Sequence, residues 1–221
     1  MSVKIYIPGD SGAVALGADR LALSMQKAVR AQGLDAEIIR NGSRGLYWLE
    51  PMVEVETEAG RVAYGPVRPS DVDGLLAAGF IEGGDHPLLL GDPEELPFLK
   101  RQTRLTFARC GITDPLSLND YRKHGGLAGL TNAVAMEPKA IVTQVTESGL
   151  RGRGGAGFPT GIKWNTVLEA EAPQKYIVCN ADEGDSGSFA DRMIMEGDPF
   201  LVIEGMIIAG IATGATKGYV Y

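Results

Sequence analysis

Residues 148–164 read SGLRGRGGAGFPTGIKW. Six glycines fall within positions 149–161, so backbone N–H groups there can face an anion without obstruction from side chains. Arg151, Arg153 and Lys163 add positive charge, and the stretch contains no acid. A helix expected from about residue 162 to 170 offers its positive N-terminal end to the same place. The stretch therefore predicts a phosphate-binding loop.

Two common phosphate-binding motifs do not describe this loop. No strand leads directly into it and no acid stands at the ribose position, which excludes a G-x-G-x-x-G dinucleotide fingerprint. A Walker loop is excluded because Gly-Lys-Ser/Thr does not occur. A flexible surface loop is the remaining alternative, and we disfavour it because a linker gains nothing from the bulky Phe158, Pro159 and Trp164.

A second polar segment, residues 180–192 (NADEGDSGSFADR), follows the strand expected over 175–179. Loops at the carboxyl ends of strands are where α/β proteins bind ligands. The spacing of its four carboxylates does not fit a calcium loop of the D-x-D-x-D-G type. Two interpretations stay open: the amide and acids hydrogen-bond a heterocycle and a ribose, or the segment is a solvated acidic turn.

The first 82 residues alternate between strand and helix patterns. The order β-α-β-β-α, with a parallel first pair, predicts a small thioredoxin-like domain. Residues 83–95 are rich in glycine, proline and acid and predict a linker. The elements expected before this linker are strands 3–7, 36–40, 52–57 and 61–65, and helices 16–32 and from 70.

The remainder of the chain is expected to be mainly helical. Residues 100–109 carry four basic side chains and no acid, which fits a solvated structural face or a docking strip for an acidic partner. The elements expected after the linker are helices 117–124, 127–136, 138–147 and 162–170, strand 175–179, a helix after 198–199, and strand 218–221.

Composition and cysteine content limit the class of protein. The formal net charge of −7 argues against a nucleic-acid partner, which needs a basic surface. Cys110 and Cys179 are too few for a disulfide framework or a four-thiolate metal site, and they suit a reducing compartment. The most apolar stretch, 200–212, contains Glu204 and is too short to span a bilayer. We therefore expect a cytoplasmic protein with no metal ligands of its own and no membrane partner.

The segments SGLRGRGGAGFPTGIKW and NADEGDSGSFADRMIMEGDPF together resemble the FMN- and NADH-binding signature of one family of flavoproteins. This family contains the flavoprotein subunit of respiratory complex I, the diaphorase subunits of NAD-reducing hydrogenases and those of soluble NAD-dependent formate dehydrogenases. The resemblance implies an α/β fold class: a thioredoxin-like domain, then the N-terminal part of an FMN-binding α/β domain. The implied boundaries are 1–82 for the thioredoxin-like domain, 83–137 for linker and helical lead-in, and 138–221 for the FMN/NAD(H)-binding part.

The same resemblance implies roles for individual residues. Hydride transfer would take place at FMN, so no side chain of this chain is expected to be catalytic. Phe158 and Asp185 would contact NAD(H), the first by stacking on the adenine. Thr166 departs from the family pattern, where this position is often aromatic, which implies a weaker adenine stack. The residues implied to contact FMN are Gly152, Arg153, Gly154, Gly155, Lys163, Asn180, Asp182 and Glu183.

The N-terminal domain is similar to thioredoxin-like [2Fe–2S] modules of the same systems, but it lacks their cysteines. The frame C-x-G-x-C-x-x-x-P reads SRGLYWLEP here, so Ser43 and Tyr47 replace cysteines, and the upstream pair would fall near Pro8 and Ala13. This degenerate form most resembles the β subunit of soluble, molybdenum-containing formate dehydrogenases.

That resemblance implies a function and a set of partners. Electrons from formate would pass through iron–sulfur clusters and FMN to NAD⁺, with a molybdenum catalytic subunit and a [2Fe–2S] thioredoxin-like subunit as partners. A [4Fe–4S] cluster is expected only in a part of the subunit beyond Tyr221. The alternatives are a hydrogenase diaphorase, a complex I-like NADH dehydrogenase, and a truncated, non-catalytic docking module.

We predict that no iron–sulfur cluster binds to residues 1–96. This segment has no cysteine, and a [2Fe–2S] cluster needs four ligands that are normally thiolates. Electron paramagnetic resonance of the reduced chain after iron reconstitution measures this directly. A [2Fe–2S] signal that survives replacement of Cys110 and Cys179 by serine would contradict the prediction.

Overall fold

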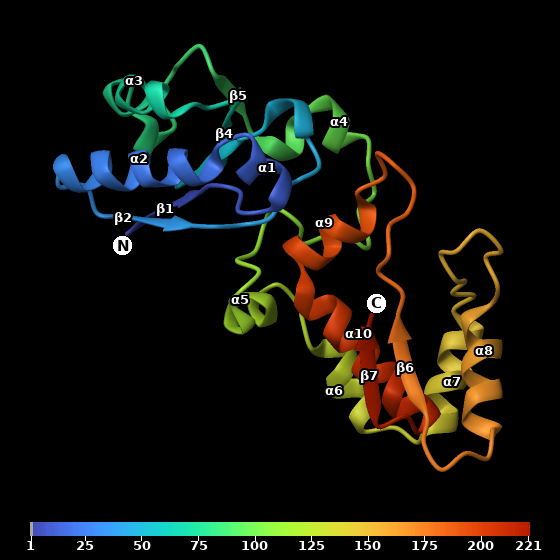
Figure 1. Ribbon diagram of the computed structural model, residues 1–221. Helices are drawn as coiled ribbons and strands as arrows, with labels where there is room; N and C mark the ends of the chain where they lie inside the picture. Colours follow the sequence, from blue (N-terminus) through green and yellow to red (C-terminus); the bar gives the residue numbers. More distant parts are fainter. Residues whose placement is uncertain (1) are drawn as a thin grey trace. The chain divides into compact units, whose positions relative to one another are not determined.

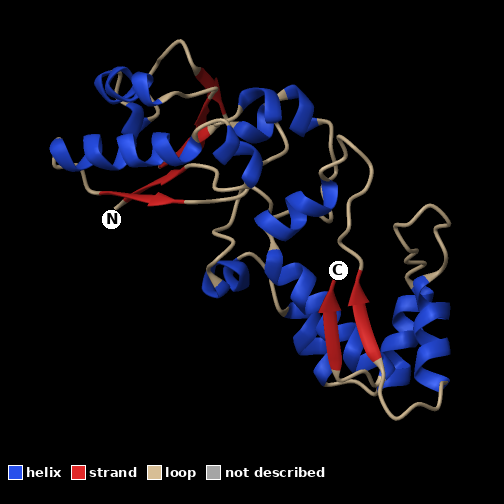
Figure 2. Cartoon of the chain, in the orientation of Figure 1, coloured by secondary structure: helices blue, strands red, loops and turns tan. Residues whose placement is uncertain are grey.

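The computed structural model describes residues 2–221, which divide into two compact units. Within the described residues, the first unit consists of 2–120 together with Met193–Asp198, and the second of Tyr121–Arg192 together with Pro199–Tyr221. Figure 1 follows the chain through both units, and Figure 2 shows that each unit contains one sheet.

The sheet of the first unit has five strands in the order β2-β1-β3-β4-β5. β1 pairs with β2 in parallel and with β3 in antiparallel fashion, so Ile5 faces Ile38 on one side and Val55 on the other. This arrangement confirms the predicted thioredoxin-like layout and the α/β fold class. The strands are β1 (Val3–Tyr6), β2 (Ala36–Ile39), β3 (Val53–Thr57), β4 (Gly60–Tyr64) and β5 (Leu89–Gly91).

β5 is a difference from the sequence-based prediction, because residues 83–95 were expected to be a linker without regular structure. Leu89 and Gly91 instead pair with Tyr64 and Ala63 of β4. Leu88 and Leu89 also pack against the core of the unit. A strand of three residues is too short to produce a recognisable alternation, so no sequence pattern reveals it.

The first unit has one long helix, α2, which packs against the sheet, and several short helices. α2 presents Leu21, Met25 and Val29 to the core, and Figure 1 shows it lying along β1 and β2. Burial of each such side chain contributes about 1.5–3 kcal/mol. The helices of the first unit are α1 (Ser11–Ala15), α2 (Ala18–Ala31), α3 (Val72–Ala77) and α4 (Pro97–Lys100), with α5 (Leu118–Lys123) at its border.

The predicted helix 16–32 corresponds to α2, which begins two residues later, and the short helix α1 before it was not predicted. Gly17 has a φ of +101°, a conformation that side chains other than glycine rarely adopt, and it separates α1 from α2. Asp10 precedes α1, and its Oδ1 accepts hydrogen bonds from the N–H groups of Gly12 and Ala13. This is the usual way in which an N-cap aspartate begins a helix.

A buried ion pair fixes the loop between β2 and β3. The Arg44 Nε atom lies 2.5 Å from Glu54 Oε1, and both side chains are almost fully buried. Arg61 approaches the same carboxylate at 3.2 Å, and Glu94 pairs with Arg44 from the other side. Burial alone would lower the pKa of Arg44, but the carboxylates of Glu54 and Glu94 outweigh it and raise that pKa.

A second buried acid lies in the same loop. Glu50 accepts a hydrogen bond of 2.7 Å from the Ser43 hydroxyl and one of 3.0 Å from the Met52 N–H group. Burial, opposed by these hydrogen bonds and reinforced by the nearby carboxylates of Asp10 and Glu54, raises the pKa of Glu50 to about 7.

The second unit packs its helices against a two-stranded parallel sheet. β6 (Tyr176–Cys179) pairs with β7 (Lys217–Val220). α7 has the predicted bounds, and Pro138 occupies its first turn, where a missing N–H group costs nothing. The helices are α6 (Ala128–Val134), α7 (Pro138–Glu147), α8 (Thr160–Glu169) and α10 (Pro199–Thr213).

α7 and α8 lie side by side because a glycine allows close approach (Figure 1). A Cβ atom added to Gly161 would lie 2.1 Å from the Thr146 hydroxyl oxygen, so only glycine fits at that point.

The apolar helix α10 carries one buried acid, Glu204. This carboxylate accepts hydrogen bonds from the Tyr121 hydroxyl and from the N–H groups of Leu127 and Leu130, the last two at 2.8 and 2.9 Å. It therefore satisfies backbone donors at the start of α6 that have no partner within that helix. No helix among residues 2–221 combines the length and the apolarity needed to cross a bilayer.

We expect the free energy of unfolding to fall as the pH rises from about 4.5, the ordinary pKa of glutamate, to about 7. Ionisation of Glu50 is disfavoured by burial, so the stabilisation present with the neutral carboxyl is lost across this window. The slope is at most about 1.4 kcal/mol per pH unit for this group.

Glu50→Gln should reduce this slope, although Asp10, whose pKa burial also raises, will leave part of it. The measurement is urea unfolding at several pH values, with Glu58→Gln, an exposed site, as the control. Equal slopes for Glu50→Gln and the unmodified chain would contradict this assignment.

Candidate functional site

The glycine loop, residues 151–159, projects between the end of α7 and the start of α8. Its two ends form an isolated antiparallel bridge between Arg151 and Pro159. Gly152 N–H donates to the Phe158 carbonyl at 2.8 Å, and Thr160 N–H donates to the Leu150 carbonyl at 2.9 Å. The loop is therefore closed at its base and leads directly into the N-terminus of α8.

The interior of the glycine loop is organised by its own backbone. Gly157 has a φ of +53° and donates to the Gly154 carbonyl at 3.0 Å, which forms a tight turn. The Arg151 Nε atom donates to the Gly157 carbonyl at 2.6 Å and braces this turn. Cβ atoms added to Gly154 or Gly155 would meet nothing within 4 Å, so this edge of the loop is open to a ligand.

Lys163 reaches back from the first turn of α8 to the glycine loop. Its Nζ atom lies 3.2 Å from the position of a Cβ atom built on Gly152 and 5.9 Å from the centre of the Phe158 ring. Within residues 2–221, no carboxylate forms an ion pair with this amine. The Arg153 guanidinium donates to the Arg151 carbonyl, at 3.2 Å.

These groups fit a bound phosphate. In the part of the chain that the structure describes, two cations without carboxylate partners and a glycine-rich backbone stand at the N-terminus of a ten-residue helix. An anion there would gain charge-assisted hydrogen bonds and the favourable end of the helix dipole.

The acidic loop, residues 180–189, begins where β6 ends. The Asn180 side-chain carbonyl accepts a hydrogen bond of 3.2 Å from the Asp182 N–H group, which stabilises the first turn of the loop. Asp185 is exposed, and its backbone carbonyl accepts from Ser188 N–H at 3.3 Å. The side chains of Asn180, Asp182 and Asp185 are thus available to a ligand.

Glu183 is engaged differently from its neighbours. Its two carboxylate oxygens accept from the N–H groups of Asp191 and Arg192, each at 3.2 Å, and so cap α9 (Ala190–Gly197). Desolvation opposes ionisation of this group, but the Ser188 hydroxyl and the backbone amides of α9 prevail and lower its pKa. The sequence did not predict α9, whose first three residues were included in the acidic segment. Contact of Glu183 with a flavin stays a prediction.

Phe189 is a feature of the acidic loop that the sequence did not single out. Its φ is +57°, which is unusual for a bulky residue and marks local backbone strain. The Arg192 guanidinium lies 4.4 Å from the centre of its ring. Nothing in the sequence could have identified this conformation, because the strain depends on the path between the loop and α9.

The structure brings together part of the predicted set. Gly152, Phe158 and Lys163 meet at the glycine loop, whereas the predicted residues of the acidic loop follow β6 and precede α9. Each loop is held by its own local contacts. Their convergence on one cofactor stays a prediction.

The basic stretch 100–109 has mainly structural contacts. Lys100 pairs with Glu95, and Arg109 pairs with Asp198 at 2.8 Å. Arg104 donates to the Arg44 carbonyl at 3.2 Å. These contacts favour the structural interpretation of the stretch over a docking strip.

Neither cysteine belongs to a cluster of metal-binding side chains within residues 2–221. Cys110 is buried, and burial raises the pKa of its thiol to about 12. Such a thiol stays protonated and is a poor nucleophile at neutral pH. Cys179 is only partly buried.

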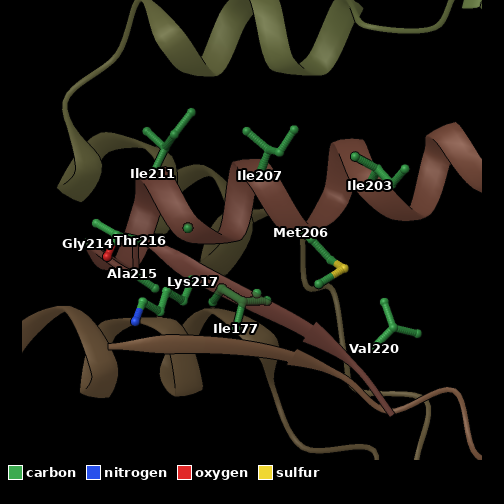
Figure 3. Close-up of a pocket in the computed structure, with 12 residues that line it drawn as sticks. Ile177, Ile203, Met206, Ile207, Ile211, Gly214, Ala215, Thr216, Lys217 and Val220 are labelled. Atoms are coloured by element: carbon green, nitrogen blue, oxygen red, sulfur yellow. The ribbon is translucent and has the colours of Figure 1, made fainter. Parts of the chain in front are cut away.

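A separate cavity of about 640 Å³ lies between α10 and the β6–β7 sheet. Figure 3 shows Ile203, Ile207 and Ile211 in line along α10, with Ile177 and Val220 on the strands. None of the predicted cofactor-binding residues lines this cavity. We do not assign the cofactor to it, because its lining offers few donors for a phosphate.

Comparison with known families identifies the C-terminal part of the chain. Residues 145–221 match the model of the Nuo51 FMN-binding domain. The match includes both the glycine loop and the acidic loop, and it supports FMN as the flavin of this segment.

Three curated relatives are similar to parts of the chain. The NADP-reducing hydrogenase subunit HndC of Solidesulfovibrio fructosivorans is 54% identical over 122 residues, 55% of this chain and 25% of the relative. An NADH-quinone oxidoreductase subunit of Aquifex aeolicus is 50% identical over 105 residues, 48% of this chain and 24% of the relative. The NAD-reducing hydrogenase HoxS subunit alpha of Cupriavidus necator is 34% identical over 189 residues, 80% of this chain and 28% of the relative.

These alignments differ in extent. The one with the HoxS subunit is long enough to include part of the first unit, whereas the match to the FMN-binding domain begins at residue 145. The chain spans about a quarter of the length of each of these relatives.

We predict that Lys163→Ala weakens FMN retention without unfolding the second unit. Loss of one charge-assisted contact to a phosphate, typically about 1.5–3 kcal/mol, should raise the FMN dissociation constant roughly tenfold to a hundredfold. Flavin content after gel filtration of the assembled protein measures this. Lys139→Ala, at an exposed position of α7, is the matched control. Equal flavin content in the two variants would rule out the phosphate contact.

Proposed function

We propose that this chain binds FMN and NAD(H) and serves as an electron-transfer subunit of an NAD-dependent oxidoreductase. The observation that carries the proposal is the closed glycine loop, inside a segment that matches an FMN-binding domain. Arg153 and Lys163 stand at this loop without a carboxylate partner among residues 2–221. When bound, FMN would exchange a hydride with the nicotinamide and single electrons with the iron–sulfur clusters of the assembly.

In this proposal the two loops have different tasks. The backbone of Gly152, Gly154 and Gly155, with Arg153 and Lys163, holds the flavin phosphate. Asn180 and Asp182 accept or donate hydrogen bonds at the flavin ring, and Glu183 reaches the same region while it caps α9. A basic cradle and an acidic loop would thus bind opposite ends of one cofactor.

Two further residues are assigned to the nucleotide. Phe158 is about half exposed at the base of the glycine loop, so its ring can stack on an adenine. Asp185 would repel a pyrophosphate, so we assign its carboxylate to the carboxamide or a ribose hydroxyl of NAD(H).

We propose formate as the electron donor of the assembly, with a molybdenum subunit and a [2Fe–2S] subunit as partners. The support is the thioredoxin-like unit without cluster cysteines, in which Ser43 and Tyr47 occupy the cysteine frame. The proposal includes a cytoplasmic location and a [4Fe–4S] cluster outside this segment.

A hydrogenase diaphorase is the second candidate. The observation that favours it is the long alignment with a subunit of an NAD-reducing hydrogenase, which covers 80% of this chain. A complex I-like NADH dehydrogenase is supported by the shorter alignment with the NADH-quinone oxidoreductase of Aquifex aeolicus.

One purification separates these candidates. The chain is tagged, isolated with its natural partners, and tested for flavin identity and for reduction of NAD⁺ by formate or by hydrogen. Released FMN with formate-dependent activity supports the proposal, and hydrogen-dependent activity selects the diaphorase. An assembly without flavin would refute the FMN proposal itself.

We predict that Asp185→Asn spares FMN but raises KM for NAD(H). The change keeps the size of the side chain and removes its charge, so it isolates the electrostatic contribution. Loss of one hydrogen bond to a charged group, about 1.5–3 kcal/mol, corresponds to a roughly tenfold or larger rise in KM.

The measurements are flavin content, NADH oxidation, and dye reduction by the upstream donor, all on one preparation. Dye reduction should persist because it does not use the nucleotide. Glu171→Gln, an exposed change after α8, is the control. If flavin and both activities fall in parallel, Asp185 shapes the turn through its backbone contacts and does not bind the nucleotide.

A further inference from the structure

Residues 193–198 (MIMEGD) belong to the first unit, although the residues before and after them belong to the second. They form the last turns of α9 and the residue that follows it. The acidic loop immediately precedes α9 in the chain. Contacts that fix residues 193–198 therefore also fix the C-terminal end of α9, the helix that follows the acidic loop.

One side of this segment touches the loop after β2. A Cβ atom added to Gly42 would lie 2.5 Å from the Cα atom of Gly197, so the two backbones are in direct contact. A Cβ atom on Gly45 would lie 3.3 Å from the Met193 sulfur. Glycine is required at position 42, because any side chain would push the two backbones apart.

Polar side chains at two other places in the first unit also bind residues 193–198. The Arg109 Nε atom lies 2.8 Å from the Asp198 Oδ2 atom, and the Asp198 side chain is only 1% exposed. Ser11 donates to the Glu196 carboxylate from both its N–H group and its hydroxyl, at 2.9 and 3.2 Å. Ser11, residues 41–45 and residues 109–111 together form a seat for residues 193–198.

Hydrogen bonds and close packing connect the residues of the seat to one another and to the sheet. Asn41 Nδ2 donates to the Gly111 carbonyl at 2.7 Å, and Arg61 donates to the same carbonyl at 3.1 Å. A Cβ atom on Gly111 would lie 2.2 Å from Arg44 Cγ, so this glycine packs directly on the buried arginine. The position of the seat is therefore set by the sheet of the first unit.

At its other end, α9 is joined to the acidic loop by Glu183, which caps the amides of Asp191 and Arg192. α9 has eight residues and is about 12 Å long, so the capped residues 191–192 and the seated residues 193–197 belong to one short helix. A shift of the seated residues is therefore expected to move the capped turn, because the helix between them is continuous.

We infer that the seat is a positioning device for the acidic loop, and that the thioredoxin-like unit sets the nucleotide affinity through it. Gly42, Gly197 and Asp198 act as positioning residues: they touch no cofactor but fix the helix that carries the loop. A test by nucleotide kinetics rests on the proposed function, whereas a test by hydrogen exchange does not.

The test compares two identical changes in the first unit. Gly42→Ala places a methyl group against Gly197, whereas Gly74→Ala in α3 meets only His86, at 3.6 Å, and is the control. Both variants are made in the complete assembly. Hydrogen exchange of peptides covering residues 180–192, flavin content, KM for NADH and kcat are measured on each.

We expect Gly42→Ala to speed exchange across residues 180–192 and to raise KM for NADH about tenfold, since misplacement by an ångström costs up to a hundredfold. Flavin content and dye reduction by the upstream donor should fall less than the affinity for NADH, because the glycine loop still holds the flavin phosphate, and Gly74→Ala should change none of these quantities. A folded Gly42→Ala protein with unchanged exchange and unchanged KM would overturn the inference.

If Gly42→Ala does not fold, Glu196→Ala provides the same test. Glu196 is partly exposed, and its replacement removes the hydrogen bonds from Ser11 and a repulsion of Asp10. Unchanged exchange in that variant overturns the inference, and faster exchange supports it. A wild-type assembly that lacks FMN would refute the proposed function, and the exchange measurement would still test the seat.

Discussion

The first unit depends on the buried ion pair between Arg44 and Glu54. Neither charge can be left alone in this position, because removal of one partner from a buried pair typically costs about 3–5 kcal/mol. The pair holds the loop after β2 against the centre of the sheet, and Arg61 extends it to the carbonyls of Gly111 and Ile112. Through these bonds one electrostatic cluster orders two loops that are about 60 residues apart in the chain.

The second unit separates its charges in a way that suits a cofactor with unlike ends. Cations and free backbone amides gather at the N-terminus of α8, and acids gather where β6 ends. Both groups of side chains stand where α/β proteins commonly bind ligands: a helix N-terminus leaves backbone N–H groups unpaired, and a loop follows the carboxyl end of a strand. In the core, the single carboxylate of Glu204 likewise accepts hydrogen bonds from backbone N–H groups at the start of α6.

The sequence predicted what is encoded locally. α7 was correct because Pro138 marks its start and its apolar residues have helical spacing, and the glycine loop was evident from composition alone. β5 was missed because three residues show no alternation. α9 was missed because its first residues were assigned to the acidic segment, where no pattern shows that Glu183 caps a helix. The contact of Gly42 with Gly197 could not be predicted, since neither glycine carries a signal of its partner so far along the chain.

The discontinuity of the first unit has a consequence for biosynthesis. Residues 193–198 leave the ribosome after the whole insertion from 121 to 192, which takes roughly 4–15 s at typical elongation rates. During this interval the nascent thioredoxin-like domain exposes Gly42 and Arg109 with their eventual partners not yet made. The first unit therefore becomes complete only after residues 121–192 of the second unit have been synthesised. No continuous stretch of chain contains all of one unit and none of the other.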